Sequence, residues 1–245
     1  MINGKRVIAV IPARSGSKGL PRKNIKVLHG RPLLGWPILA AKNSKYVDKV
    51  IVSTDSEEFA DVARAQGAEV PFLRPAALSG DTAKSVDVLF HALDFLSERG
   101  EHYKYIVLLE PTSPLTETAD IDMALDQLEG NDVGAVSIVG VSKVEGAHPA
   151  FDVCLNENKG TLRPYKYELG QSIRRQDLTP LYFFDGSLYI SDVTALYQRK
   201  TFYHESTLGY ITPRWKALEI DSLFDFVCAE AVMDNLELLR SDEVV

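Results

Sequence analysis

The sequence predicts an α/β protein built on a doubly wound, mostly parallel sheet, and three observations lead to this prediction. Short aliphatic runs typical of buried parallel strands recur through the first 140 residues. Segments with the apolar spacing of helices lie between these runs, and the alternation is the pattern of right-handed crossover units. The chain, with 245 residues, is also long enough to bury a full hydrophobic core without a disulfide or metal to stabilise it.

The expected strands share a nearly continuous apolar character, because both faces of such a sheet are covered by helices. They are, in chain order, Arg6–Ile11, Lys49–Ser53, Tyr105–Leu109, Ala135–Val141, Gly186–Ser191 and Leu208–Ile211.

The clearest expected helix is Ser85–Arg99, whose apolar residues recur at steps of three and four and form one buried stripe. A second helix is expected over Ser56–Gln66, with Gly67 in the position favoured after a helix end. The pattern indicates a single closing helix over Leu223–Leu239.

Residues 142–182 break the alternation of strands and helices. This stretch mixes glycine, proline, asparagine and lysine with short β-like pieces such as Phe151–Leu155. We interpret it as an excursion from the sheet within one domain that spans residues 1–245. An arm of this kind is suited to contacts between subunits.

Charge and composition exclude several functional classes. The chain has 27 basic and 34 acidic residues, a net charge of −7, which disfavours general binding to nucleic acid or to anionic membranes. The longest apolar runs, such as Val7–Pro12, fall far short of the ~18 residues of a membrane span. Cys154 and Cys228 fit no zinc spacing or disulfide framework, and the N-terminus lacks the pattern of a signal peptide. We therefore expect a soluble, cytoplasmic protein.

The loop after the first strand, residues 11–24, concentrates positive charge in this acidic protein. Open α/β sheets bind ligands at the carboxyl ends of their strands, where this loop lies. Its glycines allow backbone N–H groups to approach an anion, and each charge-assisted hydrogen bond contributes roughly 1.5–3 kcal/mol. The loop matches neither the Walker A nor the Rossmann pattern, and a solvated basic loop is the alternative. Its position favours a phosphate site. The cations are Arg14, Lys18, Arg22 and Lys23.

The same loop resembles the N-terminal signature of the acylneuraminate cytidylyltransferases, which comprise CMP-sialic acid synthetases and their relatives for bacterial nonulosonic acids. The likeness extends over nearly the whole chain, and several separate motifs occur in the family's order. These motifs are Val52–Asp55, Arg74–Pro75 with Leu78–Ala83, Pro111–Leu115, Arg174–Asp177, Asp185–Ile190 and Glu219–Asp221.

The resemblance implies a nucleotide-diphospho-sugar transferase-like fold and Mg²⁺-dependent transfer of CMP from CTP. The acceptor would be the anomeric hydroxyl of an acidic 2-keto-3-deoxy sugar, and the reaction would release pyrophosphate. The CMP-sugar would serve lipopolysaccharide or capsule biosynthesis. The resemblance also implies a homodimer in which residues 142–182 reach the partner. A CMP-Kdo-type or other sugar nucleotidyltransferase and a nucleotide-binding homologue without catalysis remain alternatives. A glycosyltransferase is supported only by the Glu-x-Asp pair and the fold class.

For the phosphates, the resemblance assigns the basic loop to the CTP triphosphate. Arg14, Lys18 and Lys23 would stabilise the leaving pyrophosphate and so act in catalysis. Ser17 and Gly19 belong to the same nucleotide-binding set.

For the rest of the nucleotide, the resemblance assigns Asn24 and a segment beginning at Arg74. Arg74, with Ser85 near the start of the following helix, would recognise cytosine, whose carbonyl oxygen suits a planar arginine fork. Without the resemblance, Arg74 would be read as a surface cation. Asp81 is a candidate nucleotide residue, and the alternative is a turn or cap role.

The acidic segment Glu219-Ile220-Asp221 is the candidate metal site. Residues i and i+2 of an extended segment point to one face, and Mg²⁺ binds through one or two carboxylates together with phosphates. The family usually carries two aspartates here, so the glutamate is a departure. We expect Asp221 to be the main ligand and a catalytic residue, with Glu219 second. Asp225 fits a capping box with Ser222 and is expected to be structural.

The candidate sugar site also contains a departure from the family. Glu110 stands where the family commonly carries a glutamine that faces the acidic sugar. A carboxylate there would repel the sugar carboxylate but accept hydrogen bonds from hydroxyls or an amine, so we hypothesise an acceptor that differs from N-acetylneuraminate near this position. Arginine suits bidentate recognition of the sugar carboxylate. The sugar-binding candidates are Glu110, Thr112, Ser113, Arg174, Arg175 and Gln176.

Overall fold

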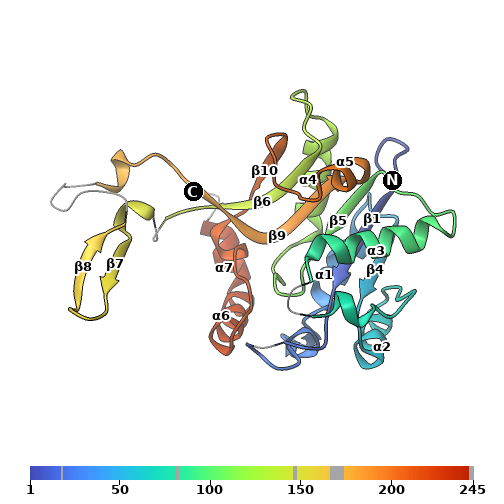
Figure 1. Cartoon of the computed structure of the whole chain (residues 1–245), viewed down its shortest axis with the longest axis horizontal. Helices are drawn as coiled ribbons and strands as arrows, with labels where there is room; N and C mark the ends of the chain where they lie inside the picture. The colour runs from blue at the N-terminus through green and yellow to red at the C-terminus, as the bar shows by residue number, and fades with distance from the viewer. Residues whose placement is uncertain (18, 81–82, 146–147, 166–173, 243–245) are drawn as a thin grey trace.

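The protein has an α/β fold with a mostly parallel central sheet, as predicted. The computed structural model describes residues 1–17, 19–80, 83–145, 148–165 and 174–242. Within these residues six strands pair in the order β10-β6-β9-β5-β1-β4 (Figure 1). Among them β9 is antiparallel to both neighbours, and the other pairs are parallel. The strands are β1 (Val7–Pro12), β4 (Lys49–Ser53), β5 (Tyr105–Leu108), β6 (Ser137–Lys143), β9 (Tyr182–Asp192) and β10 (Thr207–Ile211).

Two of the helices confirm the periodicity analysis to within two residues at each end. These are α2 (Glu57–Ala65) and α3 (Ser85–Ser97). The helices α1 (Gly35–Asn43), α4 (Thr118–Glu129) and α5 (Val193–Arg199) were not predicted.

The prediction of one closing helix over Leu223–Leu239 was wrong. The segment contains two helices, α6 (Leu223–Asp234) and α7 (Leu236–Asp242). Asn235 separates them with a backbone φ of −120°, and its amide donates to the carbonyl of Ala231. Asparagine commonly interrupts helices in this way, because its side chain competes for backbone hydrogen bonds.

Both faces of the sheet are buried, and β1 shows how the sequence achieves this. Val7, Ala9 and Ile11 point into the core on the side of α1 and α4. Ile8 and Val10 point into the opposite core, which packs against α3. Alternate residues of a strand face opposite sides, so a continuous aliphatic run serves both cores.

A third apolar cluster lies outside the sheet and fixes the segment that carries the predicted metal ligands. A short ribbon, β2 (Val27–Leu28) and β3 (Arg31–Pro32), packs near α6. Ile220 is fully buried in this cluster together with Leu115 and Phe226. The side chains on either side of Ile220 are thereby directed away from the cluster.

The middle of the chain forms an antiparallel hairpin, β7 (Val153–Asn156) with β8 (Thr161–Pro164). Figure 1 shows this hairpin well away from the central sheet, at the end of the extended segments that continue β6 and β9. The pairing of β6 with β9 reaches Lys143 and Tyr182, so the predicted excursion begins and ends at the sheet. A role of this arm in subunit contact stays a prediction.

No helix in the described parts of the chain is both long enough and apolar enough to cross a membrane.

Candidate active site

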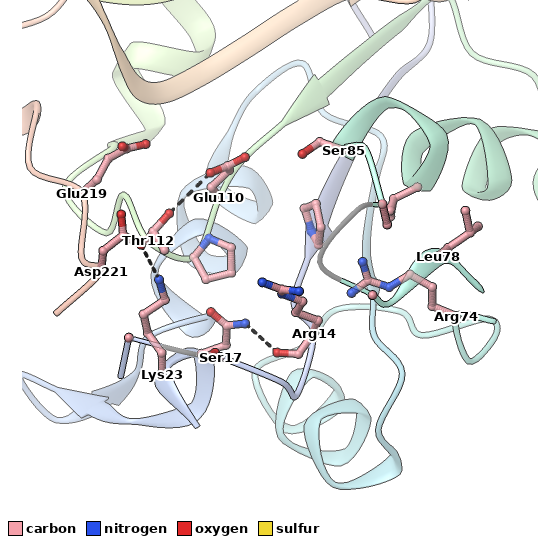
Figure 2. Close-up of a pocket in the computed structure, with 17 residues that line it drawn as sticks. Arg14, Ser17, Lys23, Arg74, Leu78, Ser85, Glu110, Thr112, Glu219 and Asp221 are labelled. Carbon is pink, nitrogen blue, oxygen red and sulfur yellow. Dashed lines mark hydrogen bonds and ion pairs between the residues drawn. The ribbon is translucent and has the colours of Figure 1, made fainter. Parts of the chain in front are cut away.

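A cavity of about 530 Å³ opens at the carboxyl ends of β1 and β5 (Figure 2). Of the described residues, 17 line it, and they come from four separate regions of the chain. Most of the residues predicted from the sequence are among them. The predicted residues at the cavity are Arg14, Ser17, Gly19, Lys23, Asn24, Arg74, Ser85, Glu110, Thr112, Glu219 and Asp221.

The basic loop is held in place by Asp55, which follows β4. Asp55 accepts hydrogen bonds from the backbone N–H of Ser15 at 2.8 Å and from its hydroxyl at 3.1 Å. Asn24 is buried, and its amide nitrogen donates to the carbonyl of Arg14 at 3.0 Å. These bonds fix the loop before any ligand binds, which lowers the entropic cost of holding one.

Arg74 is buried rather than a surface cation, with only 7% of the residue exposed. Its backbone continues the edge of the sheet by donating to the carbonyl of Thr54, and its guanidinium donates to the carbonyl of Ser53 at 3.1 Å. Burial and the nearby Arg14 lower the pKa of Arg74, whereas the charge of Asp55 raises it. The buried Nε has no hydrogen-bond partner among the described residues. The guanidinium therefore retains donor capacity at the cavity.

The basic loop and the acidic segment meet at Lys23 and Gly19. Lys23 Nζ lies 2.8 Å from Asp221 Oδ1, with the lysine side chain 12% exposed and the aspartate side chain 78% exposed. Gly19 lies so close to this segment that a Cβ there would overlap the carbonyl oxygen of Asp221. Glycine is required at this position because of the close approach of two backbones.

Glu110 and Glu219 face the same cavity, and both have raised pKa values. Burial, and then the charge of Asp221, raise the pKa of Glu110, against the hydrogen bond from Thr112 and the charge of Lys23. Burial and the charges of Glu110, Asp221 and Asp185 raise the pKa of Glu219 to about 7. Glu219 is nevertheless an exposed residue, so solvent screens part of this effect. The carboxylates thus repel one another in the absence of a cation.

Gly186 makes room for Glu219. Its φ of +71° is in the left-handed region, and a Cβ there would overlap the Glu219 carboxylate. The glycine of the Asp185-Gly186-Ser187 motif therefore leaves room for the glutamate side chain at this position.

The oxygen donors at the cavity fit a magnesium ion. In the described residues no group of three or more histidine, cysteine, aspartate or glutamate side chains forms a protein-only metal cage. Mg²⁺ does not need one, because it usually binds through one or two carboxylates, substrate phosphates and water. A divalent cation would also relieve the repulsion that raises the pKa of Glu219.

Replacing Glu219 by glutamine is expected to stabilise the metal-free protein at high pH. A carboxyl whose folded-state pKa is raised stabilises the fold at low pH, and this stability is lost as the pH rises from about 4.5 to about 7. Allowing for solvent screening, the gain at pH 8 is on the order of 1 kcal/mol, or about 2–4 °C in Tm.

The check is thermal unfolding of Glu219→Gln in a chelator at pH 5 and pH 8. Glu230→Gln, an exposed glutamate of α6, is the control. A gain of the same size at both pH values would contradict the prediction.

Several predicted site residues are not brought to the cavity in this chain. Arg174 and Gln176 are exposed near the start of β9, and Arg174 pairs with Asp177 at 2.9 Å. Arg175 starts a short 3₁₀ turn beside them. Ser113 is buried, and its hydroxyl has no partner among the described residues. Their roles toward the sugar stay predictions.

Lys18 and Asp81 lie outside the described residues, so their predicted contacts are not tested.

Sequence reasoning assigned no role to several residues of this site. Asp55 lies within one of the family-like motifs, so its position was noticed but its support of the basic loop was not. The apolar and small lining residues were also given no role, although all but Val88 lie within the motifs quoted above, because only the fold shows that they share one cavity. They are Pro12, Leu78, Gly80, Ala83, Val88 and Pro111.

The sequence of this chain was compared with protein families and with individual known proteins. The profile of a family described as Cytidylyltransferase matches residues 8–220. The CMP-N,N'-diacetyllegionaminic acid synthase of Legionella pneumophila is 34% identical over 240 residues, which cover 96% of this chain and 99% of that protein.

An N-acylneuraminate cytidylyltransferase of Streptococcus agalactiae serotype V is 36% identical over 222 residues, which cover 90% of this chain. The matched part is 51% of that protein, so the chain spans about half the streptococcal relative and nearly all of the Legionella one. Among solved structures, the CMP:2-keto-3-deoxy-manno-octonic acid synthetase complexed with CTP has a TM-score of 0.67 at 17% identity. The structural match covers 94% of this chain and 99% of the synthetase chain, and it shows that the two proteins share a fold.

Proposed function

Because this chain belongs to the cytidylyltransferase family, we propose that it transfers CMP from CTP to an acidic sugar of the sialic or nonulosonic acid type. The main observation behind the proposal is that one cavity holds both basic side chains, which can bind phosphates, and acidic side chains, which can bind a metal ion. Of the described lining residues, Arg14, Lys23 and Arg74 are basic. Glu110, Glu219 and Asp221 are acidic. Figure 2 shows Glu219 and Asp221 on the side of the cavity opposite Arg74, with Lys23 beside Asp221.

The basic side of the cavity would hold the nucleotide. Arg14, Lys23 and the backbone around Ser17 and Gly19 would bind the triphosphate, because cations and N–H groups form charge-assisted bonds with phosphate oxygens. Arg74 would bind the cytosine ring, since its buried guanidinium has donor capacity to spare. Ser85, the first residue of α3, also faces this end of the cavity.

The acidic side would hold Mg²⁺. Asp221 is the main proposed ligand and Glu219 the second. The bound ion would neutralise charge on the phosphate oxygens. Lys23 pairs with Asp221 in this structure, so the arriving triphosphate would compete for Lys23 and leave the Asp221 carboxylate available.

In the proposed reaction the anomeric hydroxyl oxygen of the sugar forms a bond to the α-phosphorus of CTP. The bond from that phosphorus to the bridging oxygen breaks, pyrophosphate leaves and the hydroxyl proton is released. Arg14 and Lys23 would stabilise the charge that develops on the pyrophosphate. The protein contributes mainly by positioning the two substrates and by neutralising charge.

The test is pyrophosphate release with each of the four NTPs against sialic, legionaminic, pseudaminic, Kdn and Kdo acids. Release with CTP and a nonulosonic acid supports the proposal. Activity with Kdo alone favours the CMP-Kdo alternative. Tight CTP binding without release for any sugar favours a homologue without catalysis.

Glu110 is expected to determine which acidic sugar is accepted. Its carboxylate can accept hydrogen bonds from hydroxyl or amino groups but repels a sugar carboxylate, whereas glutamine offers both a donor and an acceptor. We therefore expect Glu110→Gln to shift the ratio of kcat/KM for N-acetylneuraminate over the preferred sugar upward by about tenfold or more.

Competition kinetics on the same sugar panel measures this ratio. Glu98→Gln, an exposed glutamate just after α3, is the control. An unchanged ranking of sugars would rule out a specificity role for Glu110.

The arm is proposed to form a homodimer contact. Val153, Leu155 and Leu162 are exposed, and the hairpin register places Leu155 opposite Leu162 and Val153 opposite Pro164 on one face. A hairpin with a bare apolar face is unstable alone and is stabilised by packing against another surface.

Light scattering on Leu155→Asp is expected to show a monomer where the parent protein is a dimer. Thr161→Asp, on the opposite face of the hairpin, is expected to remain a dimer. A dimeric Leu155→Asp protein would place the contact elsewhere.

The proposal also locates the reaction in the cytoplasm, where CTP is available. The CMP-sugar would then serve a glycosyltransferase that builds a surface glycan such as lipopolysaccharide or capsule.

A further inference from the structure

Lys216 is a buried cation on the segment that leads into the candidate metal ligands, and the proposed reaction does not use it. It lies in the 3₁₀ turn Arg214–Lys216, three residues before Glu219. Its Nζ lies 2.9 and 2.8 Å from the two carboxylate oxygens of Asp120 and 2.8 Å from Glu117 Oε2. A buried lysine with this many ionic contacts is held in one position.

The acceptors of Lys216 belong to the first turn of α4. Glu117 is the N-cap residue, and Asp120 completes a capping box by accepting from the Glu117 backbone N–H at 2.8 Å. Asp120 also accepts from the hydroxyl of Tyr210 on β10 at 3.0 Å. Burial opposes ionisation of Glu117, but the hydrogen bonds and charges of Lys216 and of Arg240, which also donates to Glu117, outweigh it and keep the pKa of Glu117 below its usual value.

This network joins the two segments that carry the acidic side of the cavity. The loop with Glu110 and Thr112 leads into α4, and the turn with Lys216 leads into Glu219 and Asp221. A second link lies closer to the cavity, where the backbone N–H of Ile220 donates to the carbonyl of Thr112 at 2.8 Å. The two segments are therefore fastened at Lys216 and again at Ile220.

We propose that Lys216 is a positioning residue, which acts through Asp120 to hold the Glu219–Asp221 carboxylates against the Glu110–Thr112 loop. The inference rests on the proposed function, because it concerns the geometry of metal-dependent nucleotide binding. A buried ion pair adds little stability over an apolar pair, so its contribution here is a fixed geometry. A displacement of about 1 Å at such a site costs on the order of 10²-fold in rate.

The experiment compares the parent protein with the double variant Lys216→Met/Asp120→Asn. The second change avoids an unpaired buried charge at position 120. The two bonds to Asp120 use different oxygens, and the asparagine can keep both because its Oδ1 accepts from the Glu117 N–H while its Nδ2 donates to the Tyr210 hydroxyl oxygen. We expect a folded protein whose Mn²⁺ affinity in the presence of CTP, measured by calorimetry, is about tenfold weaker. CTP binding without metal should stay within twofold, and kcat should fall at least tenfold with little change in the KM for CTP.

The control is Lys5→Met/Glu129→Gln at the other end of α4. Lys5 Nζ lies 2.6 Å from Glu129, which also accepts from the hydroxyl of Tyr105. This pair has the same kinds of partner as the first, although the Lys5 side chain is 41% exposed, and neither residue lines the cavity. It is expected to lose some thermal stability and to keep the parent metal affinity.

Two results would overturn the inference, and they differ from failure of the proposed function. A folded Lys216→Met/Asp120→Asn protein with parent metal affinity and kcat excludes a positioning role. A tenfold loss of Mn²⁺ affinity and of kcat in both double variants would show a general effect on stability instead. The proposed function fails separately, and the inference with it, if the parent protein binds no metal together with CTP.

Discussion

Replacing Asp221 by alanine is expected to reduce CTP-dependent pyrophosphate release by about 10³-fold without unfolding the protein. The carboxylate is the main proposed Mg²⁺ ligand, and loss of one group that stabilises transition-state charge typically costs 10²–10³-fold or more. Its side chain is 78% exposed, so alanine opens no cavity in the core. The loss should appear chiefly in kcat, with unfolding temperature and CTP binding without metal near those of the parent.

The control for Asp221 is Asp234→Ala, an exposed aspartate of α6 that pairs with His29 and lies outside the cavity. It is expected to keep full activity. Near-normal turnover of Asp221→Ala would refute its role at the metal.

Replacing Gly19 by alanine is the second change with a large expected effect. The added Cβ would overlap the carbonyl oxygen of Asp221, so either the basic loop or the acidic segment must move. Because the phosphates and the metal ligands must keep their spacing, we expect a loss of about 10²-fold in kcat/KM. Gly19 is exposed, so the unfolding temperature should change little.

The control is Gly16→Ala in the same loop, where an added Cβ would meet open space. Both variants remove the backbone freedom of one glycine, and only Gly19→Ala creates the clash. The measurement is kcat/KM from steady-state kinetics. An equal loss of kcat/KM in the two variants would show that loop flexibility, rather than the close approach to Asp221, controls activity.

Most of the fold could be predicted because its signals are local. The aliphatic run of β1 and the three- and four-residue spacing of α3 are visible in a short window of sequence. The break at Asn235 was missed, since apolar residues occur on both sides of it and a single asparagine in a sequence does not show that its side chain will bond to the backbone and end the helix. The helix α1 lacks a clear amphipathic pattern. The helix α4 has one, with Ile121, Ala124, Leu125 and Leu128 at helical spacing, and was overlooked although its signal is local.

Much of the candidate site could also be predicted, since motifs such as residues 11–24 carry several polar residues within one loop. The environment of these residues could not be predicted from the sequence. Arg74 reads as a surface cation next to a proline, yet the fold buries it beside Ser53 and Arg14. Lys216 is likewise one lysine among many in the sequence, and its contact with Asp120 depends on how α4 packs.

The sequence by itself determined the fold class, the family and the identity of most residues at the cavity, because each of these depends on short contiguous motifs. Only the tertiary structure decided how those motifs meet. Lys23 and Asp221 are 198 residues apart and form an ion pair, and Gly19 approaches the same segment through its backbone. Such contacts depend on the packing of strands and loops that are distant in sequence, and no local pattern encodes them.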